Sequence, residues 1–168
     1  MLTEHLTARF GAALTDLSEE PGTLRATVTR DALGDVCRFC RGNEEFQCDY
    51  LACLSGVDRE EAIEVVYHLY SLRRGHMIVL RARAAKDDCW LPSVTDIWKA
   101  ANWHERETAE MFGVAFHGHP HPGHLLLPTG WRGYPLRKDY VPDPDYTRPD
   151  ELAPEVWEEF CRQVEAEY

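Results

Sequence analysis

The sequence predicts an α+β fold, with a mixed, mainly antiparallel sheet of about four strands, helices on one face, and an extended proline-rich C-terminal tail. Segments with the two-residue periodicity of strands alternate with segments whose apolar residues recur at helical spacing. Eight of the ten prolines lie between residues 120 and 154, which disfavours regular helices and central strands there. We therefore predict an α+β domain over residues 1–116 and a proline-rich loop and acidic tail over residues 117–168.

The first third of the chain predicts a helix, a strand and a second helix. The apolar residues of the first helix, with Thr3 as its cap, are Leu6, Phe10, Ala13, Leu14 and Leu17. The alternation in "TLRATVTR" predicts a half-buried strand. Asp31 is predicted to cap a second helix that ends at Gly42-Asn43. The apolar face of that helix holds Leu33, Val36, Cys37 and Cys40.

The middle of the chain predicts strands followed by two short helices. Alternation in "FQCDYLACLSGVD" places on one face Phe46, Cys48, Tyr50, Ala52 and Leu54. The strand "AIEVVYHLYSL" turns at Arg73-Arg74-Gly75 into "HMIVLRARA", which predicts a hairpin. Two capping boxes, Ser93 with Asp96 and Asn102 with Glu105, predict two short helices over about 93–101 and 103–112. Gly113 is predicted to end the second helix. "PEVWEEFCRQVEAEY" predicts a final acidic helix.

Charge and hydropathy exclude several classes of protein. The net charge is −11, and residues 139–168, with ten acids and two bases, supply −8 of it. The remainder is nearly balanced, so there is no dominant basic surface for nucleic acid. No segment approaches the ~18 apolar residues of a membrane span. The N-terminus has no apolar signal-peptide core, so we expect a cytoplasmic chain with its six cysteines reduced.

Cysteine spacing provides the first candidate for a metal site. Cys37 and Cys40 form a C-x-x-C pair, with Cys48 and Cys53 nearby, and paired thiolates at such spacing bind zinc or iron–sulfur clusters. Both Cys37 and Cys40, however, lie on the apolar face of the predicted helix, where cysteine packs as a small hydrophobic residue. They are therefore weak metal candidates, and a metal-dependent enzyme using a cysteine or histidine cluster is a lower-ranked alternative.

The stretch "NWHERETAEMFGVAFHGHPHPGH", residues 102–124, is rich in histidine and glutamate. Its loop histidines are a second metal candidate, but helical spacing fixes no carboxylate beside them. "HERE" lacks the second histidine of H-E-x-x-H, because Thr108 stands four residues after His104. Acid–base catalysis by the helix carboxylates is one interpretation. Because Arg106 and Glu110 are i,i+4 partners, a structural charge network is the favoured one.

Residues 73–86 hold five bases and no acid. Arg81 and Arg83 fall on the same strand face. A solvated surface and a docking surface for an acidic partner are both consistent with this pattern.

Two motifs, in order and at a defined separation, resemble a known family over roughly residues 46–141. The first contains Glu105-Arg106-Glu107, then Glu110-Met111-Phe112-Gly113 and the turn Gly118-His119-Pro120; the second is Pro135-Leu136-Arg137-Lys138-Asp139-Tyr140. Upstream, "LSGVD" (residues 54–58) and "VVYHLYSL" (residues 65–72) match the family's strand pattern. The protein thereby resembles the C subunit of the proton-pumping NADH:quinone oxidoreductase, respiratory complex I.

The resemblance implies a cofactor-free scaffold without catalytic residues of its own, in the hydrophilic arm of a complex that uses NADH, FMN, iron–sulfur clusters and quinone. It implies a peripheral position on the cytoplasmic face of the plasma membrane, reached only through the complex. The implied partners are the D subunit, which forms the quinone site, and the B subunit, which carries an iron–sulfur cluster; residues 117–168 dock on them. Equivalent subunits of F420H2- or ferredoxin-linked dehydrogenases and of membrane-bound hydrogenases are alternatives.

The resemblance also implies which residues serve docking. They are Glu105, Arg106, Glu107, Glu110, Gly113, Gly118, His119, Pro120, Pro135, Leu136, Arg137, Lys138 and Asp139.

Overall fold

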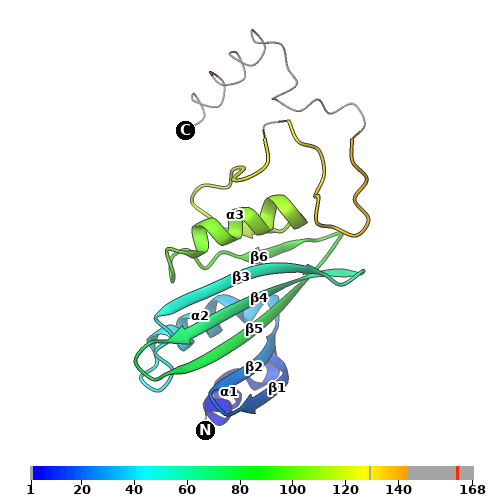
Figure 1. Ribbon diagram of the computed structural model, residues 1–168. Helices are drawn as coiled ribbons and strands as arrows, with labels where there is room; N and C mark the ends of the chain where they lie inside the picture. The colour runs from blue at the N-terminus through cyan, green and yellow to red at the C-terminus, as the bar shows by residue number, and fades with distance from the viewer. Residues whose placement is uncertain (1, 129, 144–161, 163–168) are drawn as a thin grey trace.

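The computed structural model describes residues 2–128, 130–143 and 162, and it contains one five-stranded sheet with helices on one face (Figure 1). The strand order is β1-β2-β5-β4-β3, and only the β2–β5 pair is parallel. The sheet consists of β1 (Leu14–Glu20), β2 (Thr23–Val28), β3 (Tyr50–Asp58), β4 (Ala62–Ser71) and β5 (His76–Ala85). The helices are α1 (Leu2–Phe10), α2 (Leu33–Gly42) and α3 (Ala101–Phe112), and β6 (Trp90–Pro92) pairs in parallel with β7 (Ala115–His117). The α+β class and the mixed, mainly antiparallel sheet are confirmed.

The fifth strand comes from a segment predicted as helix. Leu14 and Leu17 lie in β1, and α1 ends at Phe10. A short 3-10 turn, Gly11–Ala13, separates them, and the turn at Pro21-Gly22 pairs β1 with β2. Thr3 lies inside α1, where its backbone N–H and its hydroxyl both donate to Glu19. The helical spacing of the apolar residues from Leu6 to Leu17 therefore arose by chance, because these residues belong to a helix, a 3-10 turn and a strand.

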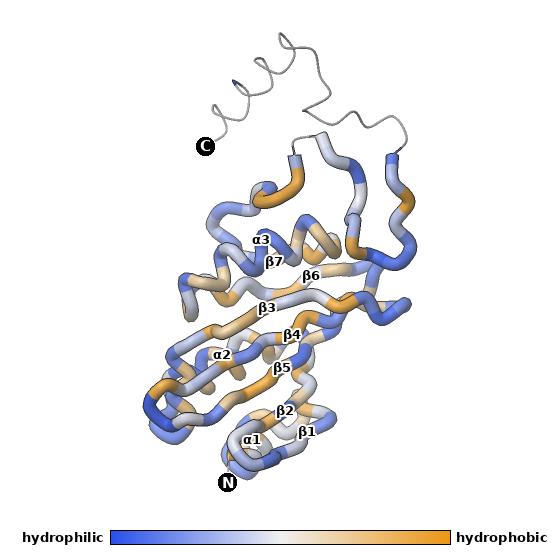
Figure 2. The backbone as a smooth tube through the Cα atoms, viewed as in Figure 1, coloured by the Kyte–Doolittle hydropathy of each residue, from blue (hydrophilic) through white to orange (hydrophobic). Residues whose placement is uncertain are grey.

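The central strands β4 and β5 place alternate side chains in the core. In β4 every second side chain from Ile63 to Leu69 is buried, and in β5 the same holds from Ile78 to Ala84. Figure 2 shows these apolar residues along the strands and hydrophilic residues in the β4–β5 turn, where Gly75 has φ +70°. The hairpin prediction is confirmed.

Helix α2 buries the predicted apolar face against this sheet. Its buried side chains include Leu33, Val36, Cys37 and Cys40. The predicted cap is wrong, because Asp31 lies in a 3-10 turn and Ala32 takes the N-cap position without a side-chain bond. Phe39 on α2 packs edge-to-face on Phe10 of α1, at 5.5 Å between ring centroids, so both helices share one face of the sheet.

A β-bulge overturns the predicted alternation of β3. The pairing of β3 with β4 shifts between Leu51 and Cys53, so Leu51 and Leu54 are both buried. Tyr50 and Ala52, predicted to share the face of Leu54, are exposed. A bulge adds one residue to a strand and reverses the alternation beyond it, which no local sequence signal indicated.

Residues 93–100 form turns instead of the first predicted short helix, and α3 alone corresponds to the second. Gly113 ends α3 with φ +74°, as predicted. Residues 118–128 and 130–143 contain neither helix nor strand and include several turns. The predicted final helix falls outside the described residues apart from Arg162. Within the part that the structure describes, no helix is long and apolar enough to cross a membrane.

Helix α3 crosses β3 where that strand carries a glycine. A Cβ at Gly56 would lie 2.5 Å from Phe112 Cδ2, so only glycine permits this approach. The contact brings the C-terminal end of α3 onto the sheet and fixes the height of the helix above β3.

We predict that Gly56→Ala lowers the free energy of unfolding by about 1–3 kcal/mol, because Phe112 has to move. Urea denaturation of the purified protein measures this change. Gly42→Ala is the matched control, since a Cβ at the end of α2 meets nothing within 4 Å. An equally small effect of both substitutions would show that Phe112 moves without cost.

Candidate functional site

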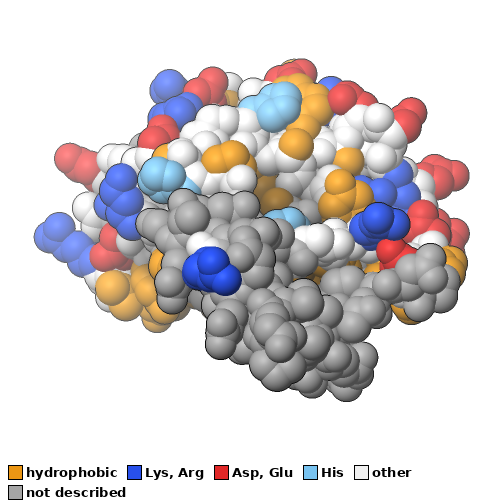
Figure 3. Space-filling view, turned by 90° about the horizontal axis from the view of Figure 1, so that it is seen from above, with side chains coloured by type: hydrophobic (Ala, Val, Ile, Leu, Met, Phe, Trp, Pro, Cys, Tyr) orange, Lys and Arg blue, Asp and Glu red, His pale blue; other side chains and the backbone are white. Residues whose placement is uncertain are grey.

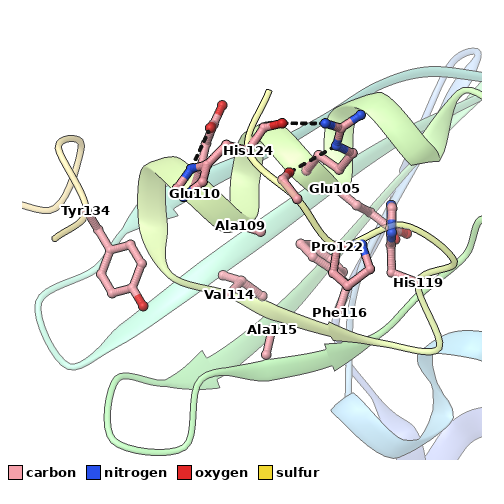
Figure 4. A pocket seen from close by; sticks show the side chains of 12 residues that line it. Glu105, Ala109, Glu110, Val114, Ala115, Phe116, His119, Pro122, His124 and Tyr134 are labelled. Carbon is pink, nitrogen blue, oxygen red and sulfur yellow. Dashed lines mark hydrogen bonds and ion pairs between the residues drawn. The ribbon is translucent and has the colours of Figure 1, made fainter. Parts of the chain in front are cut away.

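Glu110 and Arg106 of α3 lie beneath a segment that we call the strap, residues 118–127. The strap follows β7 and runs back along α3 (Figures 1 and 4). It has no regular secondary structure, so its backbone polar groups need partners from elsewhere. Two α3 side chains provide several of them.

Glu110 binds the backbone of the strap at three consecutive residues. Its carboxylate accepts hydrogen bonds from the amides of Leu125 (3.0 Å), Leu126 (2.8 Å) and Leu127 (3.2 Å). Glu110 is only 7% exposed, and His124 Nδ1 lies 3.4 Å from Oε2. Successive amides that converge on one anion form a nest-like arrangement. The buried carboxylate thereby acquires the donors that burial would otherwise deny it.

Arg106, one turn earlier, binds carbonyl groups of the same strap. Its Nε donates to Gly123 O at 3.0 Å and its Nη2 donates to His124 O. The guanidinium carbon also lies 5.5 Å from the centre of the Trp103 ring. The i,i+4 spacing places Arg106 and Glu110 on one face of α3, where the first satisfies acceptors and the second satisfies donors of the strap. We call this arrangement the strap clamp.

Glu105 points the other way, into the core. Its two oxygens accept from the Val94 amide and the Ser93 hydroxyl, each at 2.7 Å, and the residue is 0% exposed. Burial raises the pKa of Glu105 to about 7, although these two hydrogen bonds oppose the increase. The predicted capping boxes are therefore wrong, because Ser93 and Glu105 bond to each other across the 93–100 turns.

The second motif returns to the end of α3. Arg137 Nε donates to Phe112 O at 2.6 Å, Nη2 donates to Gly113 O at 3.5 Å, and the Leu136 amide donates to Met111 O at 3.1 Å. The last carbonyls of a helix have no partner within the helix, so the guanidinium of Arg137 caps the C-terminal end of α3. A Cβ at Gly113 would lie 2.5 Å from Tyr134, which leaves room only for glycine.

Asp58, at the end of the "LSGVD" strand, joins the second motif to the sheet. Its carboxylate accepts from the Lys138 amide and from Lys86 Nζ, both at 2.9 Å, and Lys86 also lies 3.6 Å from Asp139. The bond from the Lys138 amide, supported by Lys86 and the Glu60 amide, lowers the pKa of Asp58 to about 2. Sequence reasoning identified "LSGVD" only as a strand and missed this 80-residue link.

The remaining motif residues differ in exposure. Glu107, Gly118, Pro120 and Lys138 are exposed, Leu136 is 55% exposed, and Pro135 is half-buried. His119 is half-buried, with Nε2 lying 3.2 Å from Asn102 O, and burial lowers its pKa. The motifs therefore separate into side chains that bind within this protein and side chains that face outward.

The cysteine pair lies in the core. Cys37 and Cys40 are completely buried, and burial raises the pKa of both thiols, which disfavours the thiolates that metals need. Within residues 2–128, 130–143 and 162, no group of three or more cysteine, histidine, aspartate or glutamate side chains is arranged to hold a metal ion.

The basic stretch 73–86 is largely engaged within the protein. Arg74 donates to Glu44 O, Arg83 pairs with Glu64 at 2.8 Å, and Lys86 pairs with Asp58. These contacts support neither a fully solvated surface nor an acidic docking surface over the whole stretch.

We predict that Glu110→Gln releases the strap, because a neutral amide with one acceptor oxygen cannot replace a carboxylate bound to three amides. Hydrogen exchange at the Leu125–Leu127 amides should accelerate by about tenfold or more, equivalent to at least ~1.4 kcal/mol of opening free energy. The control is Glu107→Gln, which removes an exposed carboxylate from the same helix. Unchanged exchange in Glu110→Gln would show that the strap is held without this carboxylate.

A pH dependence follows from Glu105. Its pKa rises from 4.5 to about 7 on folding, so the native state holds the proton more tightly than the unfolded state. The free energy of unfolding should therefore fall as pH rises from about 4.5 to 7, by about 2–4 kcal/mol from this group. Glu105→Gln should remove that part of the slope and be more stable than wild type at about pH 8. Urea denaturation of the wild type and of Glu105→Gln across this pH range measures both free energies of unfolding. If the two free energies changed with pH in parallel, the assignment would be contradicted.

Comparisons with known proteins show which family the chain resembles. Residues 26–146 match the family model described as "Respiratory-chain NADH dehydrogenase, 30 Kd subunit". The C subunit of the NADH-quinone oxidoreductase of Roseiflexus castenholzii is 44% identical over 139 residues, covering 79% of this protein and 80% of the relative. The C subunit of the F(420)H(2) dehydrogenase of Methanosarcina mazei is 37% identical, covering 87% of this protein and 94% of that relative.

A solved structure has the same fold. It is described as Nqo5 of the trypsin-resistant fragment (1-134), and it matches with a TM-score of 0.60 and 28% identity, covering 72% of this protein and 99% of that one. The matched segment of the family model includes α3, the strap and both motifs. The protein therefore belongs to the family of the 30 kDa subunit of the respiratory-chain NADH dehydrogenase, also called its C subunit.

Proposed function

We propose that this protein is a structural subunit of the hydrophilic arm of a proton-translocating NADH:quinone oxidoreductase, without a cofactor or catalytic residue of its own. The observation that carries the proposal is the use of the charged motif side chains. Glu105, Arg106, Glu110 and Arg137 all bind backbone or hydroxyl groups of this same polypeptide. Side chains committed in this way hold a shape and leave little capacity for proton transfer to a substrate.

The partners that we propose are the D subunit with the quinone site and the B subunit with its iron–sulfur cluster, while NADH, FMN, iron–sulfur clusters and quinone bind elsewhere in the complex. Outward residues at one end of the molecule support docking there. Trp103 on α3, Leu126 on the strap and Leu136 in the second motif are each more than half exposed. Exposed large apolar side chains on a rigid backbone are typical of protein interfaces. Residues 117–168 would dock on these partners at the cytoplasmic face of the membrane.

A second assignment follows from one comparison. The match to the C subunit of an F(420)H(2) dehydrogenase extends over most of both proteins, so the same scaffold would suit a complex with a different electron donor. The donor is a property of a separate subunit under either assignment.

Purification of the tagged protein from membranes of its own organism tests the proposal. We expect the quinone-site and iron–sulfur subunits to co-purify in fixed stoichiometry. A flavin-bearing NADH-binding subunit among them would select the NADH enzyme over the F420H2 enzyme. The protein purified alone should show no flavin or iron–sulfur absorbance. Turnover by the isolated polypeptide would contradict the proposal.

Two substitutions in the second motif, residues 135–140, are expected to have different effects. Lys138→Glu should reduce incorporation into the complex by about tenfold while changing stability by less than about 0.5 kcal/mol, because its side chain is exposed. Arg137→Ala should lower the stability of the domain itself by about 1–3 kcal/mol, because it removes the cap of α3. Denaturation curves and native-gel quantification measure the two effects. Arg73→Glu, at the exposed β4–β5 turn, is the matched control for Lys138→Glu.

A further inference from the structure

A pocket lies between α3, β7 and the strap, beside the strap clamp (Figure 4). Its volume is about 340 Å³, within the range of pockets that hold a ligand group. The apolar part of its lining comes from α3, from residues 114–116, from the strap and from the region of the second motif, and consists of Ala109, Val114, Ala115, Phe116, Pro122 and Tyr134. The pocket thus exists only while the strap is held in place.

The charged and imidazole groups of the lining already have partners within the protein. Glu105 is bound by Ser93 and Val94, and Arg106 and Glu110 are bound to the strap. His119 lies against the Asn102 carbonyl and also accepts from the His121 amide. A polar ligand would have to displace one of these bonds at the cost of a buried unpaired group. The chemistry of the lining therefore favours an apolar guest.

Exposed apolar side chains lie at the same end of the molecule. Of the seven exposed large hydrophobic side chains in the described part of the molecule, five belong to α3 or to the segment that follows it: Trp103, Leu126, Tyr134, Leu136 and Val141. Figure 3 looks down on this end, where hydrophobic and histidine side chains are visible and charged ones lie along the upper and lateral margins. Apolar side chains with charged ones near them are the composition of a protein interface.

We propose that this pocket receives one large apolar side chain, aromatic or branched aliphatic, from a neutral or basic segment of another subunit of the complex. The inference rests on the proposed function, which supplies the multi-subunit complex, and it adds the position of the anchor. Binding hot spots are apolar side chains inserted into well-packed pockets near the centre of an interface. The strap clamp then has a second consequence, because it builds the wall of the pocket before the partner arrives.

Charge selects a partner over the protein's own C-terminus. Residues 144–168 carry eight acids and two bases, a net charge of −6. In the pocket lining the charges of Glu110 and Arg106 offset each other, and burial keeps Glu105 partly protonated at neutral pH. The lining therefore has no excess positive charge that would attract the acidic segment, and a neutral or basic segment needs none.

Filling the pocket tests the proposal. Ala109→Leu places added carbon atoms in the space meant for the guest and buries more apolar surface, so the isolated domain should keep or gain thermal stability. Incorporation of the tagged protein into the complex, quantified by native gel and mass spectrometry, should fall by about tenfold or more. Ala115→Trp is a second filling variant at an exposed lining position, for the case that Ala109→Leu fails to fold. The control is Ala85→Leu, an exposed alanine at the end of β5 outside the pocket.

Photocross-linking identifies the guest. With p-benzoylphenylalanine in place of Tyr134, a lining residue that is already aromatic and partly exposed, the intact complex should yield a cross-link to an identified subunit of the complex, lost on Ala109→Leu. A cross-link to residues 144–168 of the same polypeptide, or to a second copy, would overturn the proposal. Normal incorporation of both filled variants would overturn it as well. Failure of the wild-type protein to co-purify with any other subunit would instead refute the proposed function, so the two failures are distinguishable.

Discussion

The fold around α3 depends on one requirement: a segment without helix or strand must still satisfy its backbone polar groups when it packs on the protein. Prolines and glycines interrupt the strap, and the hydrogen bond from the Gly123 amide to the His121 carbonyl satisfies only part of its backbone. Glu110 and Arg106 solve this by binding three amides and two carbonyls of the strap. The same bonds solve the complementary problem of two charged side chains in residues that are less than a tenth exposed. Each side of the contact therefore compensates the desolvation of the other.

This reciprocity explains why motifs with the composition of an active site serve a structural purpose. Glu105 holds the 93–100 turns, Arg137 caps α3, and Asp58 receives the Lys138 amide. These segments and the strap converge around α3, so the helix is fixed along its length by bonds to parts of the polypeptide far away in sequence. A buried carboxylate such as Glu105 costs stability when it ionises, as its raised pKa indicates. In return, the bonds define one arrangement of the turns, where apolar contacts would permit several.

How far the sequence predicted this structure depended on whether the signal was local. The β4–β5 hairpin, the apolar face of α2 and the stop at Gly113 were all predictable, because each rests on periodicity or on a single turn residue. Strand β1 was hidden by apolar residues that happen to have helical spacing, and no local sequence signal marked the bulge in β3. The parallel pairing of β2 with β5 was not predictable either, because it joins segments that are distant in sequence. The capping boxes failed for the same reason, since Glu105 finds a better partner in Ser93 than at its own helix terminus. The family motifs located the site, but the direction of each side chain came only from the structure.

That direction changes how docking is assigned. A motif side chain that is bound within its own polypeptide has less capacity to contact another subunit, so under the proposed function we expect docking to use mainly the outward members of the same segments. Lys138 illustrates the division within a single residue, because its amide binds Asp58 while its side chain remains exposed. The strap is divided in the same way, because α3 binds its backbone while the Leu126 side chain faces outward. A surface built this way loses little conformational entropy on association, because its backbone is ordered beforehand. Under the proposed function, the buried charges of α3 would contribute to assembly indirectly, by making the exposed apolar surface rigid.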